Sequence, residues 1–172
     1  MPVVATLRTA AALRNLYGPE DVVTQHVTDI VHLNVGGKRY TTQFETLIRS
    51  RSSYFNRFVR IDDLTGKVLL FRKNFAMDST GAVFINRDGD LFAHALQFMR
   101  DGKRTALPQN TDVLQQLVRE SEYFGMDIWR TELHHQLTEM EKQRNQTLEL
   151  LIAIDTHVAQ ISESIYFNGF KP

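Results

Sequence analysis

The sequence predicts an α/β domain followed by a long helix, on the basis of three observations. A run that alternates apolar and polar residues breaks at Gly36-Gly37 and then resumes, as expected of a β-hairpin with a two-residue turn. A short apolar run, Ala82 to Ile85, leads through an Asp-Gly pair into a segment with helical periodicity. From Leu133 onward, apolar residues recur at alternating spacings of four and three, which is the pattern of a coiled-coil helix.

The composition removes several classes of protein. Apolar residues make up 42% and charged residues 23% of the 172 residues, which is typical of a globular protein. Lys+Arg and Asp+Glu both number 20, and this balance argues against a nucleic-acid partner. The absence of cysteine excludes disulfides, thiol nucleophiles and Cys-containing zinc sites. No apolar run approaches the ~20 residues that a membrane span needs, so no span is expected.

The first half of the predicted domain is a hairpin followed by helical turns. The first strand, Ile30 to Val35, places its apolar residues on one face, and Lys38 to Thr42 pairs back as the second strand. Thr42 or Gln43 then leads into a helix over Phe44 to Arg49, and we expect a further short helix over Ser50 to Phe58. The apolar residues of these segments predict one continuous core.

The middle of the domain is predicted to be a turn, a strand and a loop. Asp62 to Gly66 has the composition of a turn, Lys67 to Phe71 that of a strand, and Asn74 to Gly81 that of a loop. Ala82 to Ile85 is almost entirely apolar, which predicts a strand that is covered on both faces.

Two capped helices are expected to complete the domain. Asp88 is a suitable N-cap for a helix that runs to about Arg100, and its apolar stripe faces the core. Asn110 or Thr111 caps the next helix, which Gly125 terminates.

The C-terminal segment carries a heptad seam of more than four repeats. Leu at position a with Ile at position d favours assemblies of more than two helices, and polar residues inside the seam fix its register. A single long helix that packs on its own domain remains the alternative. The predicted seam residues are Leu133, Leu137, Met140, Arg144, Thr147, Leu151, Ile154, Val158, Ile161 and Ile165.

Residues 1–28 are predicted to form an N-terminal arm. The segment carries Arg8 and Arg14 and has no acidic residue before Glu20, a composition that is also typical of a mitochondrial targeting segment. The alternative is an arm that is flexible or docks on a partner.

For the whole protein we expect an intracellular, cytoplasmic location, because a cysteine-free chain suits a reducing compartment.

Several motifs, in this order, carry a family resemblance. They are Asn34 to Gly37, Thr46-Leu47, Phe84 to Gly89, Leu96 to Gly102, Leu107-Pro108 and Glu120 to Met126. Together they resemble the T1-type BTB/POZ domain of potassium-channel tetramerisation proteins, and in particular the soluble KCTD-like branch. The resemblance covers about 100 residues, a common size for one domain.

The resemblance implies a BTB/POZ domain at residues 29–128. The heptad pattern predicts a coiled-coil helix at 129–166 after this domain, and a tail at 167–172 completes the chain. The resemblance further implies self-association into a tetramer or pentamer. Polar residues near the hairpin and the Asp-Gly turn would meet the neighbouring subunit, namely Asn34, Lys38, Arg39, Arg87, Asp88 and Asp90. Many relatives of this type also bind Cullin-3 as ubiquitin-ligase adaptors. This chain lacks the proline usual near Ser50 to Ser53 and has a longer interval from Phe58 to Ala82, which weakens that implication.

No motif points to catalysis, a cofactor or a metal. Gly36-Gly37-Lys38 lacks the spacing of a phosphate-binding loop, and His134-His135 point about 100° apart on a helix. We therefore expect a protein that is not an enzyme. The sequence favours a homo-oligomerising BTB scaffold or adaptor that presents interaction surfaces to other proteins. The alternatives are a structural subunit that docks in a large assembly through the same two parts, and a Cullin-3 adaptor.

Overall fold

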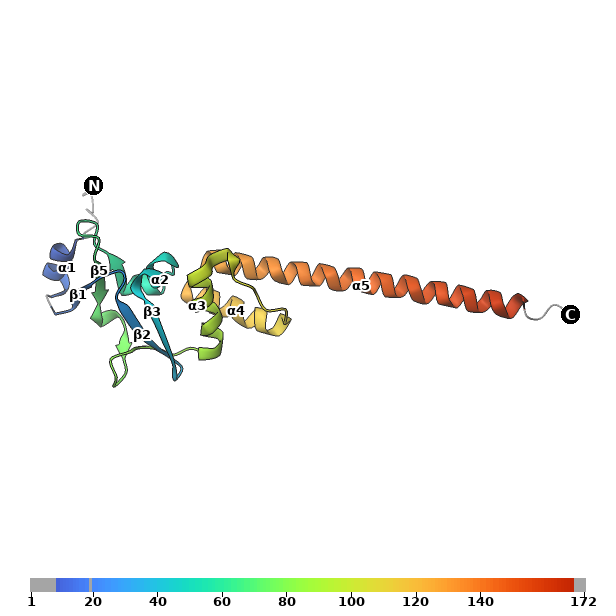
Figure 1. The fold of residues 1–172 in the computed structure, drawn as a ribbon, viewed down its shortest axis with the longest axis horizontal. Helices are drawn as coiled ribbons and strands as arrows, with labels where there is room; N and C mark the ends of the chain where they lie inside the picture. The colour runs from blue at the N-terminus through green and yellow to red at the C-terminus, as the bar shows by residue number, and fades with distance from the viewer. Residues whose placement is uncertain (1–8, 19, 169–172) are drawn as a thin grey trace. The chain divides into compact units, whose positions relative to one another are not determined.

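The computed structural model describes residues 9–18 and 20–168. The chain divides after Leu133 into two compact units (Figure 1). The first is a mixed α/β unit, and the second consists of the rest of a long helix, so the predicted fold class is confirmed.

A four-stranded sheet with the order β3-β2-β7-β6 forms the centre of the first unit. The strands β2 and β3 pair antiparallel, β7 lies parallel to β2, and β6 pairs antiparallel with β7. Val31, Leu33 and Val35 are buried on one face of β2, as the alternation predicts. The strands are β2 (Ile30–Val35), β3 (Lys38–Gln43), β6 (Ala76–Met77) and β7 (Val83–Ile85).

The predicted two-residue turn joins β2 to β3. Gly36 and Gly37 both have positive φ, at 56° and 94°, and Val35 pairs with Lys38 across the turn. This is the backbone that a two-residue hairpin needs in order to match the twist of its strands. The hairpin is therefore confirmed in position and register.

A second sheet, with the order β1-β5-β4, includes part of the N-terminal segment. Strand β1 (Val22–Gln25) pairs with β5 (Val68–Phe71), and β4 (Val59–Ile61) pairs with the other edge of β5. The turn between β4 and β5 is the predicted one. The arm interpretation missed both β1 and the preceding helix α1 (Ala10–Tyr17), whose Leu13 is buried. Residues 1–8 of that segment lie outside the described residues.

The predicted helices of the first unit begin and end at their expected caps. The side chain of Asp88 accepts hydrogen bonds from Asp90 N and Leu91 N, and Asn110 does the same for its helix at Asp112 N and Val113 N. Gly125 takes the left-handed conformation at the C-terminal end. The helices are α2 (Phe44–Arg49), α3 (Gly89–Asp101) and α4 (Thr111–Phe124), and α3 packs beside α4 (Figure 1).

Three predictions in the first unit were wrong. Ser50 to Phe58 is not one helix, because Arg51 takes a positive φ of 53° and only the 3₁₀ turn η1 (Phe55–Arg57) follows. The predicted loop at 74–81 contains β6, preceded by the 3₁₀ turn η2 (Arg72–Asn74). Strand β7 is covered on one face only, since Phe84 is 37% exposed while Val83 and Ile85 are buried.

The long helix is α5 (Asp127–Asn168), which follows α4 after the single turn at Gly125. Its first turns, up to Leu133, belong to the first unit, where Trp129 and Leu133 are buried. From His134 onward it forms the second unit. The predicted tail at 167–172 overlaps the last residues of α5 and otherwise lies outside the described residues.

Candidate assembly interface

The six residues that the resemblance assigns to a subunit interface come from two turns that touch each other. One is the β2–β3 hairpin, and the other joins β7 to α3. Gly36 N donates to Ile85 O over 3.0 Å, and a Cβ atom at Gly36 would lie 2.3 Å from the carbonyl oxygen of Arg87. Because glycine has no such atom, the hairpin turn can approach the Arg87 backbone closely. The fold therefore places the two predicted groups beside each other.

Asp78 links the hairpin to the turn that follows β6. Its Oδ2 accepts from Asn34 Nδ2 over 2.8 Å and pairs with Arg39 Nη1 over 2.6 Å. Its Oδ1 accepts from the backbone N and the hydroxyl of Thr80 and from Ala82 N. The hydrogen bonds from Thr80 and Asn34 hold the pKa of Asp78 well below its usual value of 3.8, because they favour the charged carboxylate. Asn34, Arg39, Asp78 and Thr80 are called the Asp78 cluster below.

Lys38 and Asp90 form an ion pair between the start of β3 and the first turn of α3. The hydrogen bond to Asp90 raises the pKa of Lys38. Both side chains remain largely exposed, at 52% and 79%. The neighbouring hydroxyl of Tyr40 donates to Gly89 O over 2.6 Å, which ties β3 to the same turn. An exposed pair of this kind contributes little to stability, and both of its charges lie at the surface of the unit.

Arg87 makes a two-pronged contact with α4. Its Nε donates to Glu120 Oε2 over 3.1 Å and its Nη2 donates to Oε1 of the same carboxylate. The guanidinium also lies over the ring of Tyr123, 4.5 Å from the centroid. The Glu120 side chain is only 4% exposed, whereas Arg87 is 31% exposed. Arg87 therefore compensates a buried charge and also presents one edge to solvent.

These contacts show what the sequence reasoning missed. Asp78, Thr80 and Glu120 are partners of predicted interface residues, yet they lie 33 to 44 residues away along the chain. The sequence Asp78-Ser79-Thr80-Gly81 is typical of a side-chain-bonded turn, which was a usable signal for Asp78. The distance along the chain hides the pairing of Glu120 with Arg87. The resulting surface alternates positive and negative groups over two adjacent turns.

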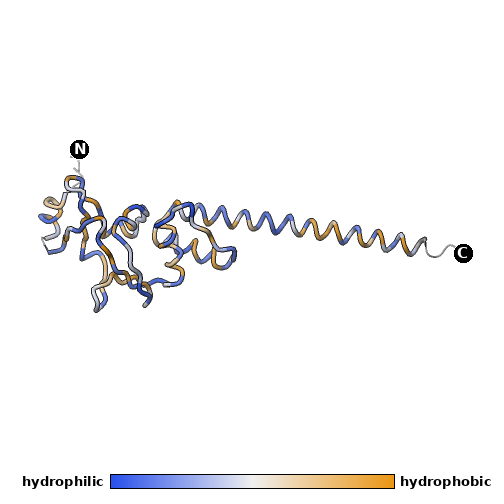
Figure 2. The backbone as a smooth tube through the Cα atoms, in the orientation of Figure 1, coloured by the Kyte–Doolittle hydropathy of each residue, from blue (hydrophilic) through white to orange (hydrophobic). Residues whose placement is uncertain are grey.

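The second unit presents the later part of the predicted seam to solvent. Five successive a and d residues are more than half exposed: Leu151 at 55%, Ile154 at 59%, Val158 at 55%, Ile161 at 59% and Ile165 at 65%. Figure 2 shows the same change along α5, where a largely hydrophilic stretch gives way, toward the C-terminal end, to one in which hydrophobic and hydrophilic residues alternate. An exposed apolar row of this length is typical of an interaction surface.

The earlier seam positions differ from these five. Leu133 is fully buried in the first unit, so it is already part of that core. Leu137 and Met140 are half-buried, and Arg144 and Thr147 are polar. The side chain of Thr147 donates to Gln143 O within its own helix. The strongest apolar part of the seam therefore begins at Leu151.

The described residues show no group of three or more His, Asp or Glu side chains placed to hold a metal ion. Within the same residues, no helix combines the length and apolar character required to cross a membrane.

Comparison with known proteins identifies the family of the first unit. Residues 31–134 match the BTB/POZ domain, in its potassium-channel tetramerisation type. An uncharacterized protein of Caenorhabditis elegans is 37% identical over 117 residues, which cover 66% of this chain and 84% of that protein. An uncharacterized protein of Dictyostelium discoideum is 38% identical over 109 residues, or 63% of this chain and 12% of that protein.

A third relative carries a functional name. SH3KBP1-binding protein 1 of Bos taurus is 39% identical over 72 residues, which cover 42% of this chain. The chain spans only 9% of the length of that protein, so the likeness concerns the domain alone. The family match covers most of the first unit, including the hairpin, the Arg87 turn and α4. The chain therefore belongs to the BTB/POZ domain family.

Proposed function

We propose that this protein is a non-enzymatic scaffold that assembles with further copies of itself and presents surfaces to other proteins. Domains of this family typically mediate oligomerisation and protein binding and are generally not enzymes. Copies meet through the BTB/POZ domain as a tetramer or pentamer, and α5 continues the assembly as a parallel helical bundle.

The observation that carries the proposal is the exposed seam of α5. Burying apolar surface contributes about 25 cal/mol per Å², so a row of Leu, Ile and Val side chains gains free energy when another helix covers it. The spacing of the row is that of helices that wrap around one another. A second copy of the same helix carries the same spacing, which supports a partner made of the same chain.

The polar turns of the first unit support a matching contact between neighbouring domains. Lys38 and Arg39 are cationic, whereas Asp88 and Asp90 are anionic, and the two groups come from adjacent turns. In a ring, each domain meets its neighbours through two different surfaces. The two adjacent turns form one of these surfaces, and its mixed charges orient the neighbour that contacts it. We propose that Asn34, Lys38, Arg39, Arg87, Asp88 and Asp90 make this contact.

Light scattering of the full chain after size-exclusion chromatography tests the proposal. We expect a mass of four or five times 19.8 kDa. The double variant Ile154→Asp, Ile161→Asp places charges at two d positions and is expected to lower this mass or make it concentration-dependent. The matched control, Thr156→Asp with Gln160→Asp, adds the same charges on the outer face of the helix and should behave as the unchanged protein. A wild-type monomer contradicts self-assembly, and equal masses for both double variants contradict the role of the seam.

A second candidate function is a structural subunit of a larger assembly. Leu150, Ile152 and Tyr166 lie outside the a and d positions, yet they are 66%, 67% and 75% exposed. This wider apolar surface favours a docking partner other than a copy of the same helix. A monomeric chain whose α5 amides become protected from hydrogen exchange only on binding a different protein would support this candidate over the first.

Adaptor activity toward Cullin-3 stays a prediction of the family resemblance, and a direct binding assay with purified Cullin-3 tests it.

A further inference from the structure

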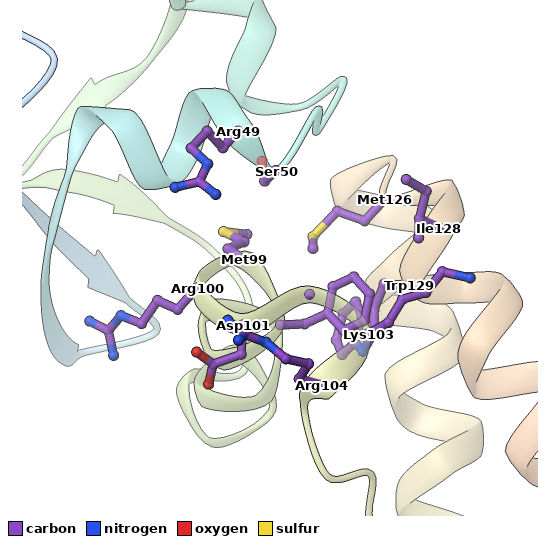
Figure 3. Close-up of a pocket in the computed structure, with 12 residues that line it drawn as sticks. Arg49, Ser50, Met99, Arg100, Asp101, Lys103, Arg104, Met126, Ile128 and Trp129 are labelled. Atoms are coloured by element: carbon purple, nitrogen blue, oxygen red, sulfur yellow. The ribbon is translucent and has the colours of Figure 1, made fainter.

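A cavity of about 320 Å³ lies in the first unit, and its lining includes none of the residues proposed for the two assembly surfaces. It is formed where the end of α2, the end of α3 with the 3₁₀ turn η3 (Gly102–Arg104), and the start of α5 meet (Figure 3). Its volume is at the lower end of the roughly 300–1,000 Å³ that is common for ligand sites. That size suits a short peptide segment rather than a large cofactor.

Most charged residues that line the cavity are cationic. Lys103 pairs with Glu132, and Arg100 donates to Thr41 O over 3.1 Å, so these two are engaged. Arg49 has only a 3.5 Å ion pair with Glu45 and keeps 73% of its side chain exposed. Arg104 is exposed and makes no ion pair or hydrogen bond through its side chain within the described part of the chain. Two guanidinium groups are therefore available at this opening.

The one anionic side chain of the lining is Asp101. Its carboxylate accepts a hydrogen bond from Gln97 on the preceding turn of α3. Figure 3 shows Arg49 on α2 across the opening from Asp101 and Arg104. The cations at this opening exceed the anions, which favours a ligand that carries negative charge.

One residue of the lining, Trp129, carries a buried donor without an acceptor. Trp129 is 1% exposed and stacks on Phe98 at a centroid distance of 5.9 Å. Its Nε1–H is buried and has no hydrogen-bond partner among the described residues. Leaving a buried donor unpaired costs about 1–3 kcal/mol, so an incoming acceptor would be favoured. Met99 and Met126 flank the same space (Figure 3), and methionine side chains adjust readily to admit a ligand.

We propose that this cavity binds an acidic peptide segment of a partner protein. A carboxylate of the peptide pairs with Arg49 and Arg104, an adjacent apolar side chain contacts Met99 and Met126, and an oxygen of the peptide accepts from Trp129 Nε1. This proposal goes beyond the scaffold function, because it names the chemistry of a partner and uses residues outside the seam and the two turns. A free inorganic anion would leave the apolar side chains of the lining uncovered, so the peptide fits the site better.

The sequence provides a direct reporter for this site, since Trp129 is the only tryptophan of the chain. The probe is a blocked Glu-Leu-Glu tripeptide, titrated into the full-length protein while the tryptophan fluorescence is recorded. We expect a saturable change in intensity or wavelength. The uncharged Gln-Leu-Gln tripeptide should bind at least tenfold more weakly, because it cannot form the charge-assisted pairs.

Two variants separate the site from general charge effects. Arg104→Gln is expected to weaken binding of the acidic tripeptide about tenfold, since one charge-assisted hydrogen bond is lost. Arg72→Gln removes an exposed charge of the same type from η2, outside the cavity, and should leave the affinity unchanged. Both side chains are exposed, so both variants should keep the thermal unfolding midpoint of the parent.

Several results of these titrations would contradict peptide binding at the cavity. No fluorescence response to the acidic tripeptide, equal binding of both tripeptides, or equal weakening by the two arginine variants would overturn it. Sodium phosphate is tested as a competitor of the acidic tripeptide. If phosphate displaces the tripeptide at an equal concentration, the site binds anions without recognising a peptide, which also contradicts the proposal. Trp129→Phe removes the Nε1–H donor but keeps an aromatic ring at this position, so it should weaken binding of the acidic tripeptide. Because this variant has no tryptophan, its binding is measured by calorimetry. The scaffold function is tested separately, because the mass of the protein in light scattering does not depend on whether the tripeptide binds.

Discussion

The two units of this chain treat their apolar side chains in opposite ways. In the first unit, residues such as Leu33, Phe92 and Leu117 are completely buried among helices and two sheets. In the second unit, Leu151 to Ile165 form an apolar row that remains more than half exposed. The first unit buries its own hydrophobic side chains, whereas the second leaves its apolar row exposed, where another chain can cover it. The comparison separates residues that make the fold from residues that we propose to make the assembly.

The largest effect should come from deleting a core aromatic ring. Phe92 is fully buried and contacts the rings of Tyr40 and Phe124 at 5.2 and 5.3 Å. Phe92→Ala should lower the free energy of unfolding of the first unit by about 3–5 kcal/mol, measured by urea denaturation. Ile154→Ala on the exposed seam should leave that unfolding transition unchanged. A similar loss for both variants would contradict the separation of the two units.

The next effect should come from the Arg87–Glu120 contact. Arg87→Ala leaves the buried Glu120 carboxylate without its cation, and we expect a loss of about 2–4 kcal/mol in the free energy of unfolding. Arg87→Lys keeps the charge but not the two-pronged geometry, so its loss should be smaller. The double variant Arg87→Ala, Glu120→Ala should be less destabilised than the sum of the single variants. Strict additivity would show that the two side chains do not interact.

The close approach of the two turns can be tested with a pair of glycines. Gly36→Ala introduces both a positive-φ strain and a clash with the Arg87 carbonyl oxygen, so it should cost about 2–3 kcal/mol of stability. Gly37→Ala has the same sign of φ but no atom within 4 Å of the added Cβ, so it should cost about 1 kcal/mol. Chemical denaturation of both variants measures the difference. Equal losses would contradict the packing of the hairpin on the Arg87 turn.

The smallest effect should be the acid dependence of the Asp78 cluster. The folded pKa of Asp78 lies below the ordinary value of 3.8, so its stabilising contribution is complete above about pH 4 and is lost as the pH falls further. Asp78→Asn removes this contribution. The variant should therefore lose less stability than the parent between pH 5 and pH 3, as measured by the urea midpoint at each pH. An identical pH dependence would contradict the lowered pKa.

Local chemistry made most of the first unit predictable. Several local features each depend on one or two residues with a strong backbone or capping preference. They are the hairpin turn at Gly36-Gly37, the helix N-caps Asp88 and Asn110, and the helix C-cap at Gly125. Those signals are readable without knowledge of distant contacts. Family motifs in the same order then indicated the BTB/POZ domain.

Distant contacts explain what the sequence could not predict. Strands β4 and β6 have three and two residues, and their pairing partners rather than their composition define them. The helix expected over Ser50 to Phe58 is interrupted because Ser53 N and Tyr54 N donate to the carbonyl oxygens of Gly125 and Phe124. These bonds join segments about 70 residues apart. The Asp78 cluster and the cavity beside Trp129 depend on contacts of the same kind.

The exposed seam can be tested most directly by crosslinking, because the chain contains no cysteine. Ile154→Cys places one thiol at a d position, and Glu163→Cys places one at an outer position of the same helix. If copies of α5 lie parallel and in register, mild oxidation should join chains through position 154 rapidly and through position 163 far more slowly. Equal rates at the two positions, or no covalent dimer from either variant at micromolar concentration, would contradict the assembly of this protein through α5.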